Sequence, residues 1–198
     1  MININFLGYV LIFFILLISL KIYYESDAFN LKCIISTVDG NKYCVRERAK
    51  LDLAADKLAR VTQKLKKLVE HLKEKYPDRG NVKRLAEGFK PSNVMEILPT
   101  SEYTAYSENK GEKLAFCLNK KKEDGSKLID INTLTFVAIH ELSHIMTKSE
   151  GHKQVFWQNF KFLLEAAKEA NIYQPVDYKK NPEPYCGMDI TDNPYFDM

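Results

Sequence analysis

Clustered basic residues are missing from this chain of 198 residues. The net charge is only +3, and the most basic stretch, residues 119–127 (NKKKEDGSK), mixes both signs as a solvated loop does. A nucleic-acid-binding face usually shows clustered Lys and Arg, so there is no strong nucleic-acid signal. With 45% hydrophobic and 28% charged residues, the composition is that of a folded chain and excludes wholesale disorder. The length suits one domain plus a short appendage.

Closely spaced cysteines are also missing. The four cysteines lie far apart in the sequence: Cys33, Cys44, Cys117 and Cys186. Without a C-x-x-C pair a cysteine zinc ribbon is not expected. Three disulfide pairings are conceivable in an oxidising compartment. Residues 39–40 (DG) suggest a hairpin turn between Cys33 and Cys44, but a two-residue turn there would place Cys44 opposite Ile35. We therefore expect free, partly buried thiols.

Charged side chains are absent from residues 1–20, and the dense apolar run extends from Phe6 to Leu20. Together with Ile22 and Tyr23 the segment reaches the length of about 20 residues that crosses a bilayer. A cleaved signal peptide usually has a basic leader and a small-x-small site. No Lys or Arg precedes this run, and residues 26–28 (SDA) are only a weak site.

We therefore expect residues 1–24 to form a single-pass transmembrane anchor and residues 25–198 to form the main domain. Basic residues follow the apolar run and none precedes it. By the positive-inside bias, the main domain then faces the cytoplasmic side and a reducing solvent.

The rest of the chain predicts an α+β domain. Residues 34–45 alternate loosely around VDGN and predict a small hairpin. From about Arg46 to Lys75, apolar residues recur at three- and four-residue steps, which predicts a long helix that packs one stripe on the domain. Residues 102–119 carry two β-rich runs around ENKG and predict a second hairpin.

A helix that is apolar nearly all round is expected from Thr133 to about Met146, with Asn132 as its N-cap. Such a helix should lie buried in the centre of the domain. An amphipathic helix follows and extends through Ala170.

Histidine is scarce, and three of the four histidines lie within thirteen positions: His140, His144 and His152. The first two belong to the predicted buried helix, where an ionisable group is costly unless it is paired or bound to metal. Four residues apart, they share one helix face and lie about 6 Å apart along the axis. Glu141 is turned by about 100° from His140, so it can reach a metal-bound water without being a ligand. H-E-x-x-H on a helix is typical of two zinc ligands and a general base.

Three residues compete for the role of third ligand. His152 follows Gly151, which lets the chain turn back after the helix. Glu165 would match zinc peptidases whose third ligand is a distant glutamate, but it can equally face solvent. Glu150 better fits an exposed turn. We predict His152.

These residues resemble the SprT-like and WLM-type zinc metallopeptidases, which pair H-E-L-x-H with a later Gly-His and an aromatic-rich helix start. HELSH, GH and VFWQNF occur here in that order between residues 140 and 160, and the match extends from about residue 103 to residue 170. The resemblance implies a small zincin-like domain in which Zn²⁺ is held by His140, His144 and His152, with Glu141 as general base. It also implies a polypeptide substrate that runs along an edge strand above the metal.

Two features differ from these families: the seven residues before His152 and the N-terminal anchor. The anchor argues against the protein–DNA adducts on which the better-known members act. Anchored proteins with this arrangement resemble those of large DNA viruses, which implies a viral or virion membrane, with the domain on the cytoplasmic or virion-interior side.

The sequence therefore predicts a membrane-tethered zinc metallopeptidase, in which Glu141 takes the proton of a metal-activated water. Two other hypotheses stay open: an inert membrane-anchored scaffold with a zincin fold, and a zinc hydrolase acting on a small amide. An intact Glu141 argues against the scaffold, because a structural zinc site needs no general base.

Candidate oxyanion donors lie in the C-terminal region: Tyr173, Tyr178 and Tyr185. Tyrosines near a tail are more often packing residues, and none of the three is preferred. We expect Trp157 and Phe160 to belong to the core.

Overall fold

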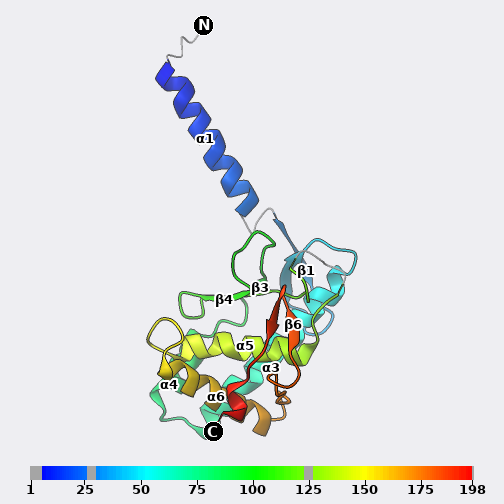
Figure 1. Cartoon of the computed structure of the whole chain (residues 1–198), viewed down its shortest axis with the longest axis vertical. Helices are drawn as coiled ribbons and strands as arrows, with labels where there is room; N and C mark the ends of the chain where they lie inside the picture. The colour runs from blue at the N-terminus through cyan, green and yellow to red at the C-terminus, as the bar shows by residue number, and fades with distance from the viewer. Residues whose placement is uncertain (1–5, 26–29, 123–126, 198) are drawn as a thin grey trace.

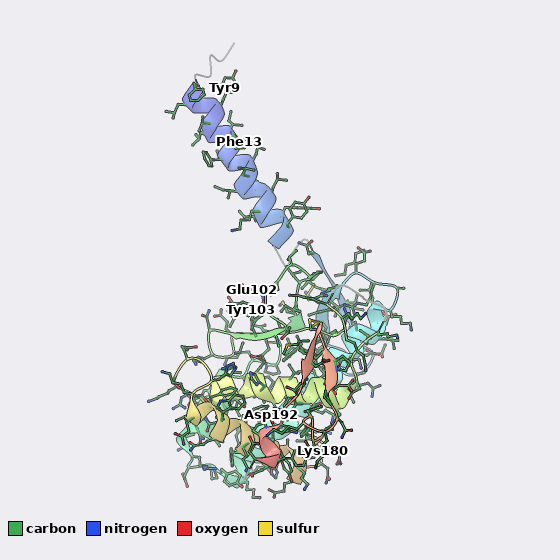
Figure 2. All side chains as sticks on the ribbon, viewed as in Figure 1. Tyr9, Phe13, Glu102, Tyr103, Lys180 and Asp192 are labelled. Carbon is green, nitrogen blue, oxygen red and sulfur yellow. A yellow bond between two sulfur atoms is a disulfide. The ribbon has the colours of Figure 1, made fainter. Side chains whose placement is uncertain are left out.

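A computed structural model of the chain describes residues 6–25, 30–122 and 127–197. Its first helix, α1 (Phe6–Glu25), projects away from the other elements, which lie together (Figure 1). From Phe6 to Tyr24 this helix is long and apolar enough to cross a membrane, and none of that span is buried. Tyr9 and Phe13 point away from the helix axis and are exposed, with no other element of the described residues against them (Figure 2). Because a core helix would be covered, α1 fits a membrane span or a signal sequence.

The remaining elements form a mixed α+β arrangement, as the sequence predicts. They follow one another along the chain as β1 (Leu31–Ile35), β2 (Lys42–Arg46), α3 (Leu51–Lys75), α4 (Gly80–Gly88), β3 (Val94–Glu96), β4 (Ala105–Glu108), β5 (Lys113–Phe116), α5 (Ile131–Met146), α6 (Gln154–Glu169), β6 (Glu183–Tyr185), β7 (Met188–Ile190) and the 3-10 helix η1 (Pro194–Phe196). Both predicted hairpins are confirmed as β1–β2 and β4–β5. The sequence did not predict α4 and β3.

Helix α3 begins at Leu51 and not at Arg46, because Arg46 ends strand β2. One face of α3 is buried, including Leu58, Leu65 and Leu72. This stripe packs on α5 and α4, and each such leucine contributes about 2 kcal/mol by leaving water. The predicted amphipathic stripe is therefore confirmed.

The central sheet has the strand order β3–β5–β4, with β5 parallel to β3 and antiparallel to β4. Strand β4 is thus an edge strand of this sheet, and it lies against α5 (Figure 1). Helix α5 is buried along most of its length and contacts α3, α4 and α6. Its N-cap is Asp130 and not the expected Asn132. The Asp130 carboxylate accepts hydrogen bonds from the N–H groups of Asn132 and Thr133, each at 2.9 Å, which satisfies two unpaired helix donors.

The expectation of free thiols is wrong. The connection between β1 and β2 is longer than two residues, since the Ser36 N–H donates to the Asn41 carbonyl at 2.9 Å. This register places Cys33 opposite Cys44, and the two form a disulfide. A second disulfide joins Cys117 to Cys186 across 69 positions of the chain. It ties the end of β5 to the hairpin of β6 and β7.

Alkylation of the native chain tests these pairings. Under denaturing conditions without reductant, we expect iodoacetamide to label none of the cysteines, because no cysteine in the described structure is free. After reduction all four should be labelled, as intact mass spectrometry will record. Labelling before reduction would instead support a domain kept in a reducing compartment.

Candidate metal centre

Three histidines converge beside α5. His140 and His144 lie one helical turn apart on α5, and His152 lies between α5 and α6. One nitrogen from each ring can be chosen so that all three lie within 4.8 Å of one another. The Nε2 atoms of His140 and His152 are only 3.1 Å apart. Such an approach needs either a tautomer in which one nitrogen donates to the other or a cation shared by both.

The chain turns back sharply after α5 to bring His152 there. Gly151 has a φ of +74°, a left-handed conformation that glycine adopts without strain. Asn159 of α6 donates to the Thr147 hydroxyl at 2.8 Å, and it accepts from Asn81 of α4 at 2.9 Å. These bonds fix the end of α5 against the two neighbouring helices, so the loop that carries His152 is held at both ends.

Aromatic rings hold the imidazoles in place. The buried Phe156 lies 4.4 Å from the His144 ring and 4.6 Å from the His152 ring, between centroids. Phe160 is buried, as expected, and its ring lies 5.1 Å from that of His140. Trp157 was expected in the core, but 45% of its surface is exposed. Its ring lies 5.7 Å from that of His152, at the surface of the site.

Burial keeps the two imidazoles on α5 neutral. It lowers the pKa of His140 to about 3, with help from the neighbouring His144 and His152. Burial, His152 and Lys110 lower the pKa of His144 to about 4. Neutral imidazole is the form that binds metal. Two imidazole nitrogens on one tetrahedral zinc lie about 3.3 Å apart, so the separation of the His140 and His152 nitrogens suits a tetrahedral metal ion of this kind.

Glu141 lies beside the histidines, with only 5% of its surface exposed. Burial raises the pKa of its carboxyl to about 8, and a backbone hydrogen bond from Ser107 of β4 lowers it in part. A bound cation would favour the ionised carboxylate. Glu141 therefore connects the helix of the histidines to the edge strand. Nothing in the sequence pattern singled out Ser107.

A cleft of about 1240 Å³ contains all four of these side chains. Its lining includes residues 102–107, which lead into and include most of β4, residues 150–152 in the loop before α6, and residues 188–192 in and after β7. Glu102 and Tyr103 lie on one side of α5 and Asp192 on the other in the view of Figure 2. Tyr185 also lines this cleft; it is buried, and its hydroxyl donates to the Thr104 carbonyl at 2.9 Å.

The other candidates lie elsewhere or face solvent. Glu165 is exposed on α6 and is not part of the histidine group. Glu150 is exposed and pairs with Lys110 at 2.9 Å. Tyr173 and Tyr178 are buried against Phe136. Among the described residues, only His152 thus joins the two histidines of α5.

No protein-family model matches the sequence. The chain is similar to uncharacterized protein R325 of Acanthamoeba polyphaga mimivirus, with 28% identity over 162 residues that cover 80% of this chain and 81% of the relative. It is also similar to uncharacterized protein 136R of Invertebrate iridescent virus 6, with 32% identity over 96 residues that cover 48% and 52% of the two chains. Among solved structures, Wss1 from Saccharomyces cerevisiae matches with a TM-score of 0.49 and 16% identity, over 64% of this chain and 87% of the other. The chain therefore has viral homologues.

Proposed function

We propose that this chain is a zinc-dependent metallopeptidase with a zincin-like fold, tethered to a membrane by α1. The observation that carries the proposal is the convergence of three histidine nitrogens beside a buried carboxylate in one cleft. A buried ionisable group is costly in a purely structural setting, whereas catalytic sites gather such groups in clefts.

His140, His144 and His152 would hold the ion, which supplies a Lewis acid for the scissile carbonyl and lowers the pKa of a water. Glu141 acts as general base: it takes one proton from the attacking water and passes it to the leaving amine. The hydroxyl of that water completes the new carboxylate as the peptide bond breaks. The hydrogen bond from Ser107 and the burial of Glu141 hold the base in place and exclude bulk solvent.

Strand β4 offers a docking edge for an extended polypeptide. The Cys117 N–H donates to the Thr104 carbonyl at 2.9 Å, so Thr104 is hydrogen-bonded to its partner on the next strand. Pairing alternates in an antiparallel ladder, and the following residue, Ala105, directs its N–H and C=O away from β5. Peptides commonly add to such an edge by backbone pairing. The substrate class we propose is therefore an extended polypeptide.

The tether rests on the length and apolar composition of α1. Two observations bear on its orientation. Basic residues that follow α1 favour a cytoplasmic or virion-interior domain, whereas disulfides persist mainly in oxidising compartments. The alkylation experiment above, repeated on material from the native host, separates the two orientations.

Metal analysis of the full chain in detergent, together with a peptide-hydrolysis assay, tests the function. We expect about one zinc per chain, hydrolysis that is lost in a chelator, and recovery when zinc is returned. A folded chain that does not bind zinc would overturn the proposal and favour the hypothesis of an inert membrane-anchored scaffold. Hydrolysis of small amides without hydrolysis of peptides would favour the hypothesis of a zinc hydrolase that acts on a small amide.

A further inference from the structure

Lys110 links two segments of the chain that line the cleft. It lies in the turn between β4 and β5, and its Nζ is 2.9 Å from a carboxylate oxygen of Glu150 in the loop between α5 and α6; both residues line the cleft. The same Nζ lies 3.2 Å from the Thr147 carbonyl, 3.4 Å from that of Ser149 and 3.5 Å from that of His144. This bridge between Lys110 and Glu150 therefore lies directly beside the histidine site.

The part of the cleft around Lys110 is held firmly. A Cβ placed on Gly111, next to Lys110, would lie 2.4 Å from the Gly88 carbonyl oxygen of α4. The turn thus packs backbone to backbone on the helical layer, and Gly111 has a φ of +109°. An exposed ion pair contributes little by itself, but Lys110 also meets three carbonyls at the end of α5. Because the turn and the ammonium group are both held, Lys110 is a fixed part of the cleft lining, and the exposed Glu150 extends from it as the second half of the ion pair.

The position of the bridge limits the length of a bound chain. Ser107, whose N–H bonds to Glu141, marks the reaction site along β4, and Lys110 follows three positions later. Strand β4 ends at Glu108, one residue after Ser107, and Lys110 lies in the turn that follows. At a rise of about 3.3 Å per residue, a peptide paired with β4 therefore has room for about two residues at most before it meets the bridge. Antiparallel pairing is the more stable arrangement. In it, the N-terminal side of the substrate points toward Lys110.

The segment that leads into β4, away from Lys110, is exposed. Tyr103, which precedes β4, has 56% of its surface accessible, and Figure 2 places it with Glu102 on the side of the domain nearest to α1. The C-terminal side of an antiparallel substrate leaves the cleft in this direction.

We propose that the bridge between Lys110 and Glu150 closes the cleft on the N-terminal side of the scissile bond. The enzyme then releases short N-terminal pieces of about two residues from polypeptides and does not cut them internally. This inference rests on the proposed peptidase function and specifies its substrate.

A random-sequence peptide library tests it. The full chain in detergent is incubated with the library, and mass spectrometry records how many residues precede each cut. In the wild type we expect cuts to concentrate near the N-terminus of the peptides. In Lys110→Ala we expect them to spread into the interior. Lys148→Ala is the matched control, because Lys148 is an exposed lysine of the same loop that does not line the cleft; its cuts should stay where those of the wild type are.

Glu150→Ala provides a second test that does not depend on the folding of Lys110→Ala, since the Glu150 side chain is 87% exposed. This variant removes the ion-pair partner of Lys110. Its cuts should spread into the interior of the peptides, as those of Lys110→Ala do. Internal cutting by the wild type, a limit on the C-terminal side, or a cut pattern that Glu150→Ala leaves unchanged would overturn the inference. These outcomes leave the peptidase function standing, whereas the absence of any Glu141-dependent cutting would overturn the function itself.

Discussion

Glu141→Gln will bind zinc as the wild type does and will lose peptide hydrolysis by about 10²–10⁴-fold, the usual contribution of a general base. The amide of glutamine has nearly the shape of the carboxyl group, and its oxygen can still accept the N–H of Ser107. It cannot take a proton from water at neutral pH. The loss should therefore fall on kcat and leave the bound metal unchanged.

The variant should fold at least as well as the wild type. Glu141 is almost fully buried, and burial raises its pKa to about 8, so a charge at this position disfavours folding in the metal-free chain. A neutral amide removes that cost. Thermal unfolding of the metal-free proteins will show whether the lost activity comes from chemistry alone.

Glu165→Gln is the matched control, because Glu165 is an exposed glutamate on α6. It should retain both zinc and hydrolysis. Full hydrolysis by Glu141→Gln would show that another group accepts the proton and would remove Glu141 from the mechanism. Loss of zinc in Glu141→Gln would show that this carboxylate is a ligand and not a base.

The histidine site was predictable because its information is local. The four-residue spacing of His140 and His144 fixes their common face once α5 is a helix. The glycine before His152 marks the point where the chain reverses, and the structure has the expected positive φ there. Helix periodicity and one turn residue therefore suffice to bring the three imidazoles together.

The partners of this site were not predictable in the same way, because they come from distant segments. Ser107 reaches Glu141 only because β4 is the strand at the edge of the sheet next to α5. Tyr185 was one of three candidate tyrosines with none preferred, and it lies in the cleft, where the Cys117–Cys186 disulfide ties its hairpin to β5. Neither strand order nor disulfide pairing follows from periodicity along one chain.

The prediction that Cys33 and Cys44 are free thiols failed for a different reason. The residues Asp39 and Gly40 are a strong signal for a two-residue turn, and they do lie in the connection. The turn closes further out, at Ser36 and Asn41. The connection therefore has four residues and not two, and the two extra residues move the partner of Cys44 from Ile35 to Cys33. The error in turn length thus hid the disulfide.

His152→Ala will lower the affinity of the site for zinc. Loss of a residue that only supports a metal ligand lowers the affinity by about 10–100-fold, and we expect the loss of a ligand itself to lower it further. The variant removes one of the three nitrogens that meet within 4.8 Å. Because His152 is exposed and lies in a loop, its truncation leaves the core and the fold unchanged. Hydrolysis should fall together with the bound metal, in contrast to Glu141→Gln.

Trp157 provides the readout for this variant. It is the one tryptophan of the chain, and its ring lies 5.7 Å from that of His152. Cobalt bound at the site should quench its fluorescence in the wild type, and the quenching should need far more cobalt in His152→Ala. Glu165→Ala should behave as the wild type does. If His152→Ala kept full zinc while Glu165→Ala lost it, the third ligand would be the glutamate, and α6 would have to turn that exposed side chain toward the cleft when metal binds.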